Sequence, residues 1–268
     1  MSIEQQYYEN DAFWSDAVFG AQDERFATVA RHIPVDVRSL LDVGCGNGSF
    51  VNMLSRVSTQ FETIHAVDRS PTALKHVQTS KTEASIDHLP FPDQSFDIVT
   101  ALEVVEHLQQ ATFDLGLSSL CRVARKYVLI SVPNEEDLEK SFVTCPSCRS
   151  RFNPDYHMRR FDSAIMQTLL SGHGFRPRET FFMGPKKRYF MVTKMIEKKL
   201  PFPLAVPCPV CGVIVPPVPA SILPSTSSNP DARPSGIGAK SGRLKSLVKG
   251  LLHSGTNFGT VATVYERE

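Results

Sequence analysis

The stretch Leu-Leu-Asp-Val-Gly-Cys-Gly-Asn-Gly-Ser, residues 40–49, decides the fold that the sequence predicts. An apolar run leads into three glycines spaced G-x-G-x-G, and Ser49–Val57 follows with the pattern of a helix. Glycines at such a point let the chain turn sharply and bring its backbone close to a ligand. A strand, a glycine loop and a helix in this order predict a nucleotide or nucleoside site. A dinucleotide site would more typically have a further glycine at position 49, where this chain has Ser49.

Outward from this loop, short apolar runs alternate with helical patterns, which predicts an α/β fold built from βαβ units. The predicted strands are Ser39–Val43, Thr63–Val67, Glu83–Ile86, Phe96–Leu102, Val128–Val132 and a closing Thr260–Tyr265. The predicted helices are Ser49–Val57, one opened by Pro71, a stretch from Glu103 to about Ala124, and Ser163–Leu170.

Two acidic residues end the second and third predicted strands. Asp68 stands where a carboxylate can accept hydrogen bonds from both ribose hydroxyls. Asp87 can accept one from the exocyclic amine of adenine. Alternatively, Asp68 caps the helix near Pro71 and Asp87 is a turn residue. The glycine loop and both acids together favour the nucleoside site.

Residues 40–49, Ala-Val-Asp-Arg-Ser (66–70) and Leu-Pro-Phe-Pro-Asp-Gln-Ser-Phe-Asp-Ile-Val (89–99) resemble the class I S-adenosylmethionine (SAM)-dependent methyltransferases of type 11/12. This resemblance implies a Rossmann-like, seven-stranded, mostly parallel sheet with helices on both faces and an antiparallel last strand, Thr260–Tyr265. It also implies that the glycines wrap the methionine portion of SAM, that Asp68 holds the ribose and that Asp87 with Ile86 recognises adenine. The candidate cofactor-binding residues are Asp42, Gly44, Gly46, Gly48, Asp68, Arg69, Ile86, Asp87 and Glu103.

The same resemblance suggests how the chain is divided. We expect an N-terminal helical segment over the cofactor at 1–37, and a SAM-binding domain made of 38–183 plus 257–268. Two insertions, 138–160 and 184–256, carry the cysteine pairs, a flexible Pro/Ser-rich loop (216–242) and a basic amphipathic helix.

Glu103-Val104-Val105-Glu106-His107 follows the fourth predicted strand. On a helix, Glu103, Glu106 and His107 would share one face, at the sheet edge where α/β folds bind ligands. With His157 they are the candidate catalytic residues, either as a base on a substrate hydroxyl or as ligands of a second divalent cation such as Mg²⁺. The pattern partly resembles ubiquinone-pathway O-methyltransferases and the enzymes that methylate small-RNA 3′ ends, which bind a metal beside the reacting hydroxyl. A metal-free role in lining the pocket is the alternative.

Two cysteine pairs, Cys145-Pro-Ser-Cys148 and Cys208-Pro-Val-Cys211, each place two thiols in a tight turn. Four thiolates satisfy tetrahedral zinc completely, as in structural sites. The sequence therefore predicts a structural zinc that staples the two insertions together. Thioredoxin-like redox chemistry, or four reduced thiols without metal, are the alternatives.

The amino-acid composition bears on which partners the chain is expected to bind. Net charge is +1, from 29 Lys and Arg against 28 Asp and Glu, so no overall charge attracts nucleic acid or a membrane surface. The polar start and the lack of an apolar run of about 18 residues predict a cytoplasmic protein with no membrane partner. We expect O-methylation of a small-molecule or glycan-like acceptor, with Arg159 and Arg160 as candidates for binding an anionic one. An RNA acceptor held by the basic stretches 186–199 and 240–249, and a non-catalytic SAM- and zinc-binding interaction module, are the alternatives.

Overall fold

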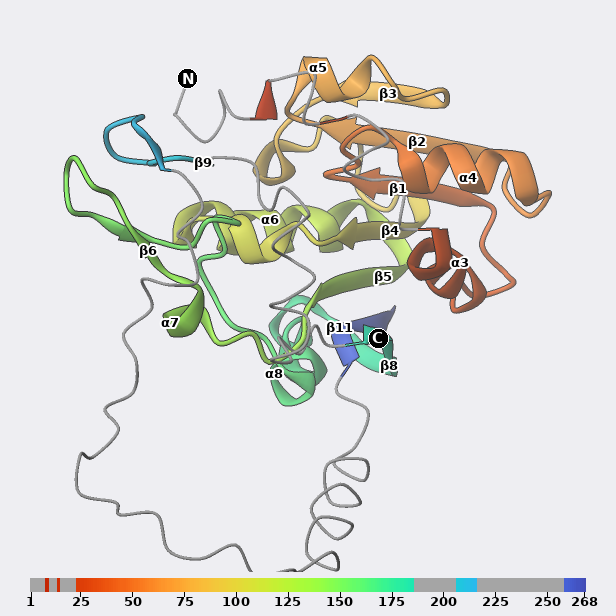
Figure 1. Cartoon of the computed structure of the whole chain (residues 1–268). Helices are drawn as coiled ribbons and strands as arrows, with labels where there is room; N and C mark the ends of the chain where they lie inside the picture. The colour runs from red at the N-terminus through yellow and green to blue at the C-terminus, as the bar shows by residue number, and fades with distance from the viewer. Residues whose placement is uncertain (1–7, 10–13, 15–22, 186–205, 216–257) are drawn as a thin grey trace, which may run out of the picture.

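The computed structural model describes residues 8–9, 14, 23–185, 206–215 and 258–268. The predicted basic stretches at 186–199 and 240–249, and the predicted loop at 216–242, lie outside these residues. The described part is built on a seven-stranded sheet covered by helices on both faces (Figure 1). The predicted Rossmann-like α/β fold is confirmed.

The strand order is β3-β2-β1-β4-β5-β11-β8. The strands are β1 (Ser39–Val43), β2 (Thr63–Asp68), β3 (Ser80–Glu83), β4 (Phe96–Leu102), β5 (Ala124–Pro133), β8 (Phe175–Pro185) and β11 (Phe258–Arg267). The first five run parallel, whereas β11 lies antiparallel between β5 and β8, as expected for the closing strand. Because the strand order reverses between β1 and β4, a crevice is expected at their carboxyl ends.

Helices form two layers. They are α3 (Asp23–Arg31), α4 (Ser49–Val57), α5 (Pro71–Leu74), α6 (Gln110–Val123), α7 (Leu138–Ser141) and α8 (Ser163–Thr168), with 3₁₀ turns η2 (Ile86–His88), η3 (Val105–His107) and η4 (Ser171–His173). Successive side chains of a strand pack against opposite layers of helices. Leu40 packs with α3 and α4, and Leu41 packs with α6 and α8. Each fully buried aliphatic side chain contributes about 1.5–3 kcal/mol, so this alternation holds the sheet between its two layers. None of the helices in the described ranges is both long and apolar enough to cross a bilayer.

The helix predicted from Glu103 to about Ala124 is wrong in its first part. The backbone of Val104 (φ −125°, ψ −49°) and of Leu108 (φ −77°, ψ 138°) is not helical, so only the short turn η3 forms before α6. Glu103 has a positive φ of 57°. Glu103, Glu106 and His107 therefore do not share a helical face.

The third strand was also misplaced, because β3 spans Ser80–Glu83 and Ile86–His88 is a 3₁₀ turn. This edge strand is largely exposed along its length, so its sequence, Ser-Lys-Thr-Glu, carries no apolar pattern. The apolar Ile86 instead packs under α6.

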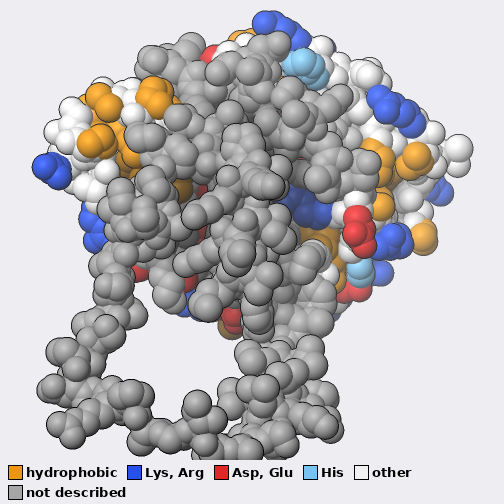
Figure 2. Space-filling view, in the orientation of Figure 1, with side chains coloured by type: hydrophobic (Ala, Val, Ile, Leu, Met, Phe, Trp, Pro, Cys, Tyr) orange, Lys and Arg blue, Asp and Glu red, His pale blue; other side chains and the backbone are white. Residues whose placement is uncertain are grey.

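The cysteine pairs lie in two small hairpins, β6 (Val143–Thr144) with β7 (Arg151–Phe152), and β9 (Val206–Pro207) with β10 (Ile214–Val215). On the face shown in Figure 2, hydrophobic side chains gather at the upper left, the side on which Figure 1 places β9. The second hairpin exposes Val210, Val213 and Ile214. The hairpins share a small core of their own, composed of Cys145, Phe152, Tyr156, Val206, Cys208 and Val215.

Candidate functional site

A cavity of about 790 Å³ opens at the carboxyl ends of β1, β2 and β4. The predicted residues that line it are Asp42, Gly44, Gly46, Asp68, Arg69, Ile86, Glu103, His107 and His157. Gly48, Asp87 and Glu106 were predicted too, but they stand behind its wall. Predicted cofactor-binding residues and predicted catalytic residues thus line the same cavity.

The glycine loop needs its glycines. Gly44, Gly46 and Gly48 have φ of 74°, 54° and 75°, a left-handed conformation that costs side-chain-bearing residues energy. A Cβ on Gly44 would lie 2.5 Å from Val104, and one on Gly46 would lie 2.7 Å from Trp14. Gly48 also precedes the first turn of α4, so the loop ends at a helix N-terminus.

Asp68 braces this loop from the end of β2. Its Oδ2 accepts the Gly46 N–H at 2.8 Å and its Oδ1 accepts the Ser70 N–H at 2.9 Å. Burial raises the pKa of Asp68, opposed by these two hydrogen bonds. The alternative role as a helix cap is excluded, because the Ser70 hydroxyl accepts the Ala73 N–H at the start of α5.

Asp42 lies at the base of the cavity and is 3% exposed. Its Oδ1 accepts a hydrogen bond of 2.5 Å from the Thr100 hydroxyl on the neighbouring β4. Burial and the nearby charge of Asp68 raise the pKa of Asp42 to about 7. Two carboxyl groups thus lie close together beneath the loop, and the inner one is disposed to hold a proton.

Ile86 and Asp87 belong to η2, which lies at one side of the cavity. Ile86 is 7% exposed and lines the cavity. Asp87 points away from the lining, with its Oδ2 3.2 Å from Nδ1 of His88. Its buried Oδ1 has no hydrogen-bond partner among the described residues, which leaves one acceptor of this carboxylate unused.

Glu103 follows β4 and borders the cavity. Its Oε1 accepts a hydrogen bond of 3.1 Å from the Ser131 hydroxyl, and its Oε2 lies 3.5 Å from the Arg25 guanidinium. Burial raises the pKa of Glu103 although the Arg25 charge opposes this. Arg25 and Phe26 of α3, which the sequence did not single out, border the same space.

Glu106, His107 and His157 come together next to Glu103. Each offers a ligand atom, and these atoms all lie within 4.8 Å of one another. The two imidazole rings meet edge to face with centroids 4.7 Å apart. The predicted meeting of these three residues is thus seen, although through a 3₁₀ turn and a distant loop instead of one helix.

Glu106 is 1% exposed, and neither of its carboxylate oxygens has a hydrogen-bond partner among the described residues. Burial and the charge of Glu103 raise the pKa of Glu106 well above its ordinary value. Burial and the neighbouring His157 lower the pKa of His107 to about 3. An unsatisfied buried carboxylate is expensive, so this position favours a proton or a cation on Glu106.

Glu136, beyond the end of β5, holds His157 from the other side. Nδ1 of His157 lies 2.5 Å from Oε2 of Glu136. Burial opposes protonation of His157, but the Glu136 carboxylate outweighs it and raises the pKa of the imidazole. Sequence reasoning missed Glu136, whose only signal is its place after the fifth strand.

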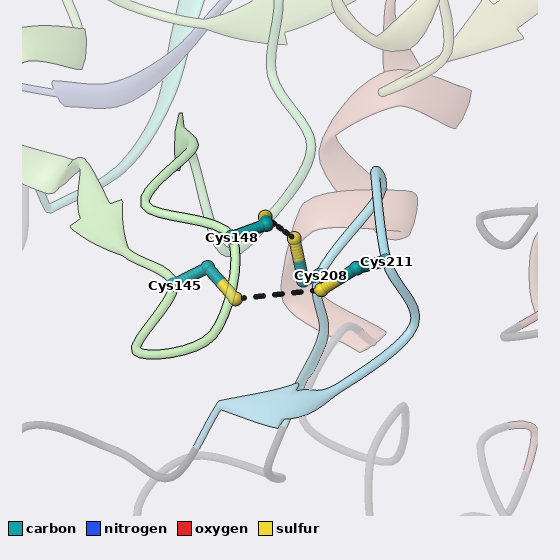
Figure 3. A group of neighbouring side chains, drawn as sticks. All are labelled: Cys145, Cys148, Cys208 and Cys211. Atoms are coloured by element: carbon teal, nitrogen blue, oxygen red, sulfur yellow. Dashed lines mark hydrogen bonds between the residues drawn. The ribbon is translucent and has the colours of Figure 1, made fainter.

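The four cysteines Cys145, Cys148, Cys208 and Cys211 converge in space (Figure 3). The Sγ atoms of Cys145 and Cys211 are 3.6 Å apart, as are those of Cys148 and Cys208. Tetrahedral zinc with Zn–S bonds of about 2.3 Å requires sulfur–sulfur distances of about 3.8 Å. The arrangement therefore fits the predicted metal.

The two cysteine turns share one backbone design. The Cys145 N–H donates to the Ser150 carbonyl, and the Cys208 N–H donates to the Val213 carbonyl, each at 2.9 Å. The residue after each second cysteine, Arg149 or Gly212, has a positive φ and donates its N–H back to the carbonyl of the first cysteine. Both turns thus direct two sulfurs towards one point.

Arg159 and several aromatic residues lie in places that the sequence did not predict. Arg159 donates to the Val105 carbonyl at 3.0 Å and its guanidinium lies 3.8 Å from the centroid of the Phe113 ring, outside the cavity lining. It is therefore a packing residue and not an anion-binding residue of this cavity. Tyr8 and Trp14 of the N-terminal segment line the cavity. Tyr156 lines it as well and was not predicted.

Comparison with known proteins agrees with this geometry. The methyltransferase domain family matches residues 41–130. A probable S-adenosylmethionine-dependent methyltransferase of Mycobacterium tuberculosis is 31% identical over 161 residues, covering 56% of this chain and 54% of that protein. The chain spans about half the length of this relative.

Two further relatives act on different acceptors. The small RNA 2′-O-methyltransferase of Arabidopsis thaliana is 30% identical over 131 residues, 42% of this chain and 14% of that protein. The ubiquinone biosynthesis O-methyltransferase of Methylobacterium nodulans is 32% identical over 98 residues, 30% of this chain and 38% of that protein.

The fold has solved counterparts. A SAM-dependent methyltransferase structure from Archaeoglobus fulgidus superimposes with a TM-score of 0.55 at 16% identity, covering 94% of this chain and 97% of that one. At this identity the likeness concerns the fold alone. Residues 41–130 thus match the methyltransferase domain family, and the chain is similar to SAM-dependent methyltransferases over about half of its sequence.

Proposed function

We propose that this chain transfers the methyl group of SAM to an oxygen atom of a small-molecule or glycan-like acceptor. The observation that carries the proposal is the single cavity of about 790 Å³ that joins the glycine loop to Glu103, His107 and His157. Its volume falls in the range of about 300–1,000 Å³ of small-molecule sites. The cofactor and the acceptor then meet without any rearrangement of the sheet.

The cofactor half is assigned residue by residue. The backbone of Gly44 and Gly46 lies against the methionine portion, and the free lone pairs of Asp68 accept from the ribose hydroxyls. Ile86 packs on adenine, whereas Asp87, its neighbour in η2, stands behind the cavity wall. Asp42 supports the loop from below, and Arg69 borders the ribose side of the cavity.

The acceptor half needs positioning above all. Methyl transfer is an in-line displacement at an activated sulfonium, so holding the acceptor oxygen in line supplies much of the acceleration. His107 is disposed to be neutral, as its lowered pKa indicates, which makes it a weak base. His157, whose pKa is raised by Glu136, is the better acceptor of the hydroxyl proton as the oxygen attacks.

Glu106, His107 and His157 also fit a divalent cation. Their one oxygen and two nitrogen ligands suit Mn²⁺, Fe²⁺ or Zn²⁺ better than Mg²⁺, which prefers oxygen. When bound, such a cation would lower the pKa of an acceptor hydroxyl. Glu136 would then be the carboxylate that orients a ligating histidine.

The cysteine cluster supports a structural zinc. Four thiolates complete its coordination and leave no position for a substrate, so this zinc is architectural. On this view residues 138–160 and 206–215 form one zinc-stapled unit beside the SAM-binding domain.

An RNA acceptor is the second candidate, favoured by the Arabidopsis relative that methylates small RNA. The charge balance of the whole chain does not favour it. Incubating the protein with radiolabelled SAM and separate pools of small metabolites, glycans and short RNAs distinguishes the two. Label in the RNA pool alone would overturn the small-molecule acceptor.

Binding of the donor is tested apart from the acceptor. By calorimetry, SAM should bind wild type, and Asp68→Ala should weaken the affinity at least about tenfold, the loss of one charged hydrogen-bonding group. Asp93→Ala, at a 74% exposed side chain, is the matched control. Unchanged affinity in Asp68→Ala would reject the nucleoside site. SAM binding without transfer to any pool would favour a non-catalytic module.

A further inference from the structure

Tyr156 connects the cysteine hairpins to the cavity. Its ring packs among Cys145, Phe152 and Cys208 in the small core, yet the residue also lines the cavity. Its hydroxyl donates a hydrogen bond of 2.7 Å to the carbonyl of Pro207, which immediately precedes Cys208. One residue thus contacts both the proposed zinc site and the cavity.

The segment 153–157 that carries Tyr156 is a tight loop. The Tyr156 N–H donates to the Asn153 carbonyl at 2.9 Å, and the Asp155 N–H donates to Oδ1 of Asn153 at 2.8 Å. Pro154, Asp155, Tyr156 and His157 all line the cavity. This loop is therefore a wall of the cavity, and it presents His157 to His107.

The loop contains one residue in an unfavourable backbone conformation. Tyr156 has φ of 58°, a conformation that costs a non-glycine residue about 1–3 kcal/mol and persists only where surrounding contacts impose it. Part of the contacts around Tyr156 comes from its own loop and the first hairpin, through Asn153 and Phe152, and part from the second hairpin, through Pro207 and Cys208. That hairpin has only two residues in each strand, too few for stability alone.

We propose that the zinc bound by the four cysteines fixes the loop 153–157 and thereby positions His157 at the acceptor side of the cavity. The inference rests on the proposed zinc site. Cys148 and Cys208 lie 60 residues apart in sequence, so a shared metal ties the Pro207 carbonyl to the chain segment that leads into the loop. Zinc is then a positioning element for the acceptor wall, although it touches no reacting atom.

The cofactor half should not depend on this zinc. Asp68 is held by Gly46 and Ser70, and the glycine loop packs against Val104, Trp14 and Val77. None of these residues belongs to the core of the two hairpins. Loss of zinc is thus expected to loosen the acceptor wall and leave SAM binding in place.

Hydrogen–deuterium exchange of the full chain tests the inference with zinc bound, after chelation, and after zinc is restored. S-adenosylhomocysteine is present throughout, and its affinity is measured by calorimetry. Chelation should raise exchange in peptides covering 153–158 about tenfold or more and leave peptides covering 40–50 unchanged. Restored zinc should reverse the change.

Tyr156→Phe supplies a test that leaves the cysteines intact. It should keep the zinc, measured by elemental analysis, and raise exchange at 153–158 about fivefold, the effect of one hydrogen bond. Tyr127→Phe is the matched control, because the Tyr127 hydroxyl bonds Asp36 and Arg178 away from the cavity. It should leave 153–158 unchanged.

The outcomes separate the claims. A zinc-loaded protein whose 153–158 exchange is unaffected by chelation and by Tyr156→Phe overturns the positioning role and leaves the zinc site standing. A protein that never holds zinc overturns both. A protein that holds zinc and shows the predicted exchange, but binds no S-adenosylhomocysteine, contradicts the proposed SAM site instead.

Discussion

Nδ1 of His157 lies 2.5 Å from Oε2 of Glu136, and this contact leaves Nε2 as the ring nitrogen available to the neighbouring His107 and Glu106. A carboxylate on one nitrogen of a histidine orients the ring and increases the basicity of the other nitrogen. Glu136 therefore sets the orientation of the His157 ring and the basicity of its Nε2.

Glu136→Gln should lower the pKa of His157, because an amide cannot stabilise the imidazolium as a carboxylate does. Turnover should fall about tenfold to 100-fold. NMR titration of the metal-free protein follows the imidazole directly. Glu139→Gln, at an exposed side chain that pairs with Arg151, is the control. An unshifted His157 pKa in Glu136→Gln would show that the contact does not govern this histidine.

Gly46→Ala should weaken SAM binding about tenfold or more and destabilise the fold. The new Cβ requires the left-handed φ of 54° at a cost of about 1–2 kcal/mol, and it lies 2.7 Å from the Trp14 ring. Calorimetry and urea unfolding measure the two effects. Gly172→Ala is the control, because its Cβ would meet no atom within 4 Å. Equal SAM affinities in the two variants would remove the glycine loop from the cofactor site.

The sequence predicts this loop well for a local reason. The residues of β1, the loop and α4 are contiguous, so strand, turn and helix follow from patterns within about 20 residues. The cysteine turns can be predicted from the sequence for the same reason, because each turn is local. The chemistry of zinc then suggests that the two pairs meet.

Other parts depend on contacts between distant segments, which a single sequence does not display. The polar edge strand β3 is defined by its pairing with β2, and η3 by tertiary packing that overrides a helical pattern. The contact of Glu136 with His157 spans 21 residues, and that of Tyr156 with Pro207 spans 51. Both were therefore missed although they build the acceptor wall.

Elemental analysis of protein prepared with zinc should find about one zinc per chain, and Cys148→Ser should abolish it because three thiolates no longer complete the site. Cys121→Ser is the control, since Cys121 lies in α6 and is buried in the main core, away from the cluster. Zinc retained in Cys148→Ser would place the metal elsewhere.

Glu106→Gln should reduce Mn²⁺ affinity at least about tenfold, because it removes the charged ligand of the proposed cation site. Titration of zinc-loaded protein followed by electron paramagnetic resonance measures this without displacing zinc. Glu83→Gln, on the exposed edge strand, is the control. If wild type and Glu106→Gln bind Mn²⁺ equally, Glu106 is instead a neutral carboxylic acid, as its raised pKa allows.

The ligand-free protein should lose stability as pH rises from about 4 to 7, in part through Asp42. Its pKa is about 7 in the folded protein against an ordinary 3.8, so between these values the folded state holds a proton that the unfolded state has released. The stabilisation is complete below pH 3.8 and is lost as pH rises through 7, by up to about 4 kcal/mol.

Asp42→Asn removes this titration and keeps an Oδ1 that can accept from the Thr100 hydroxyl. Urea unfolding at pH 4, 5, 6 and 7 should therefore show a flatter loss of stability in Asp42→Asn than in wild type. Asp93→Asn, on the surface, should keep the wild-type slope. Parallel curves for wild type and Asp42→Asn would mean that Asp42 is ionised beneath the loop, where it and Asp68 would then repel each other across the floor of the cofactor site.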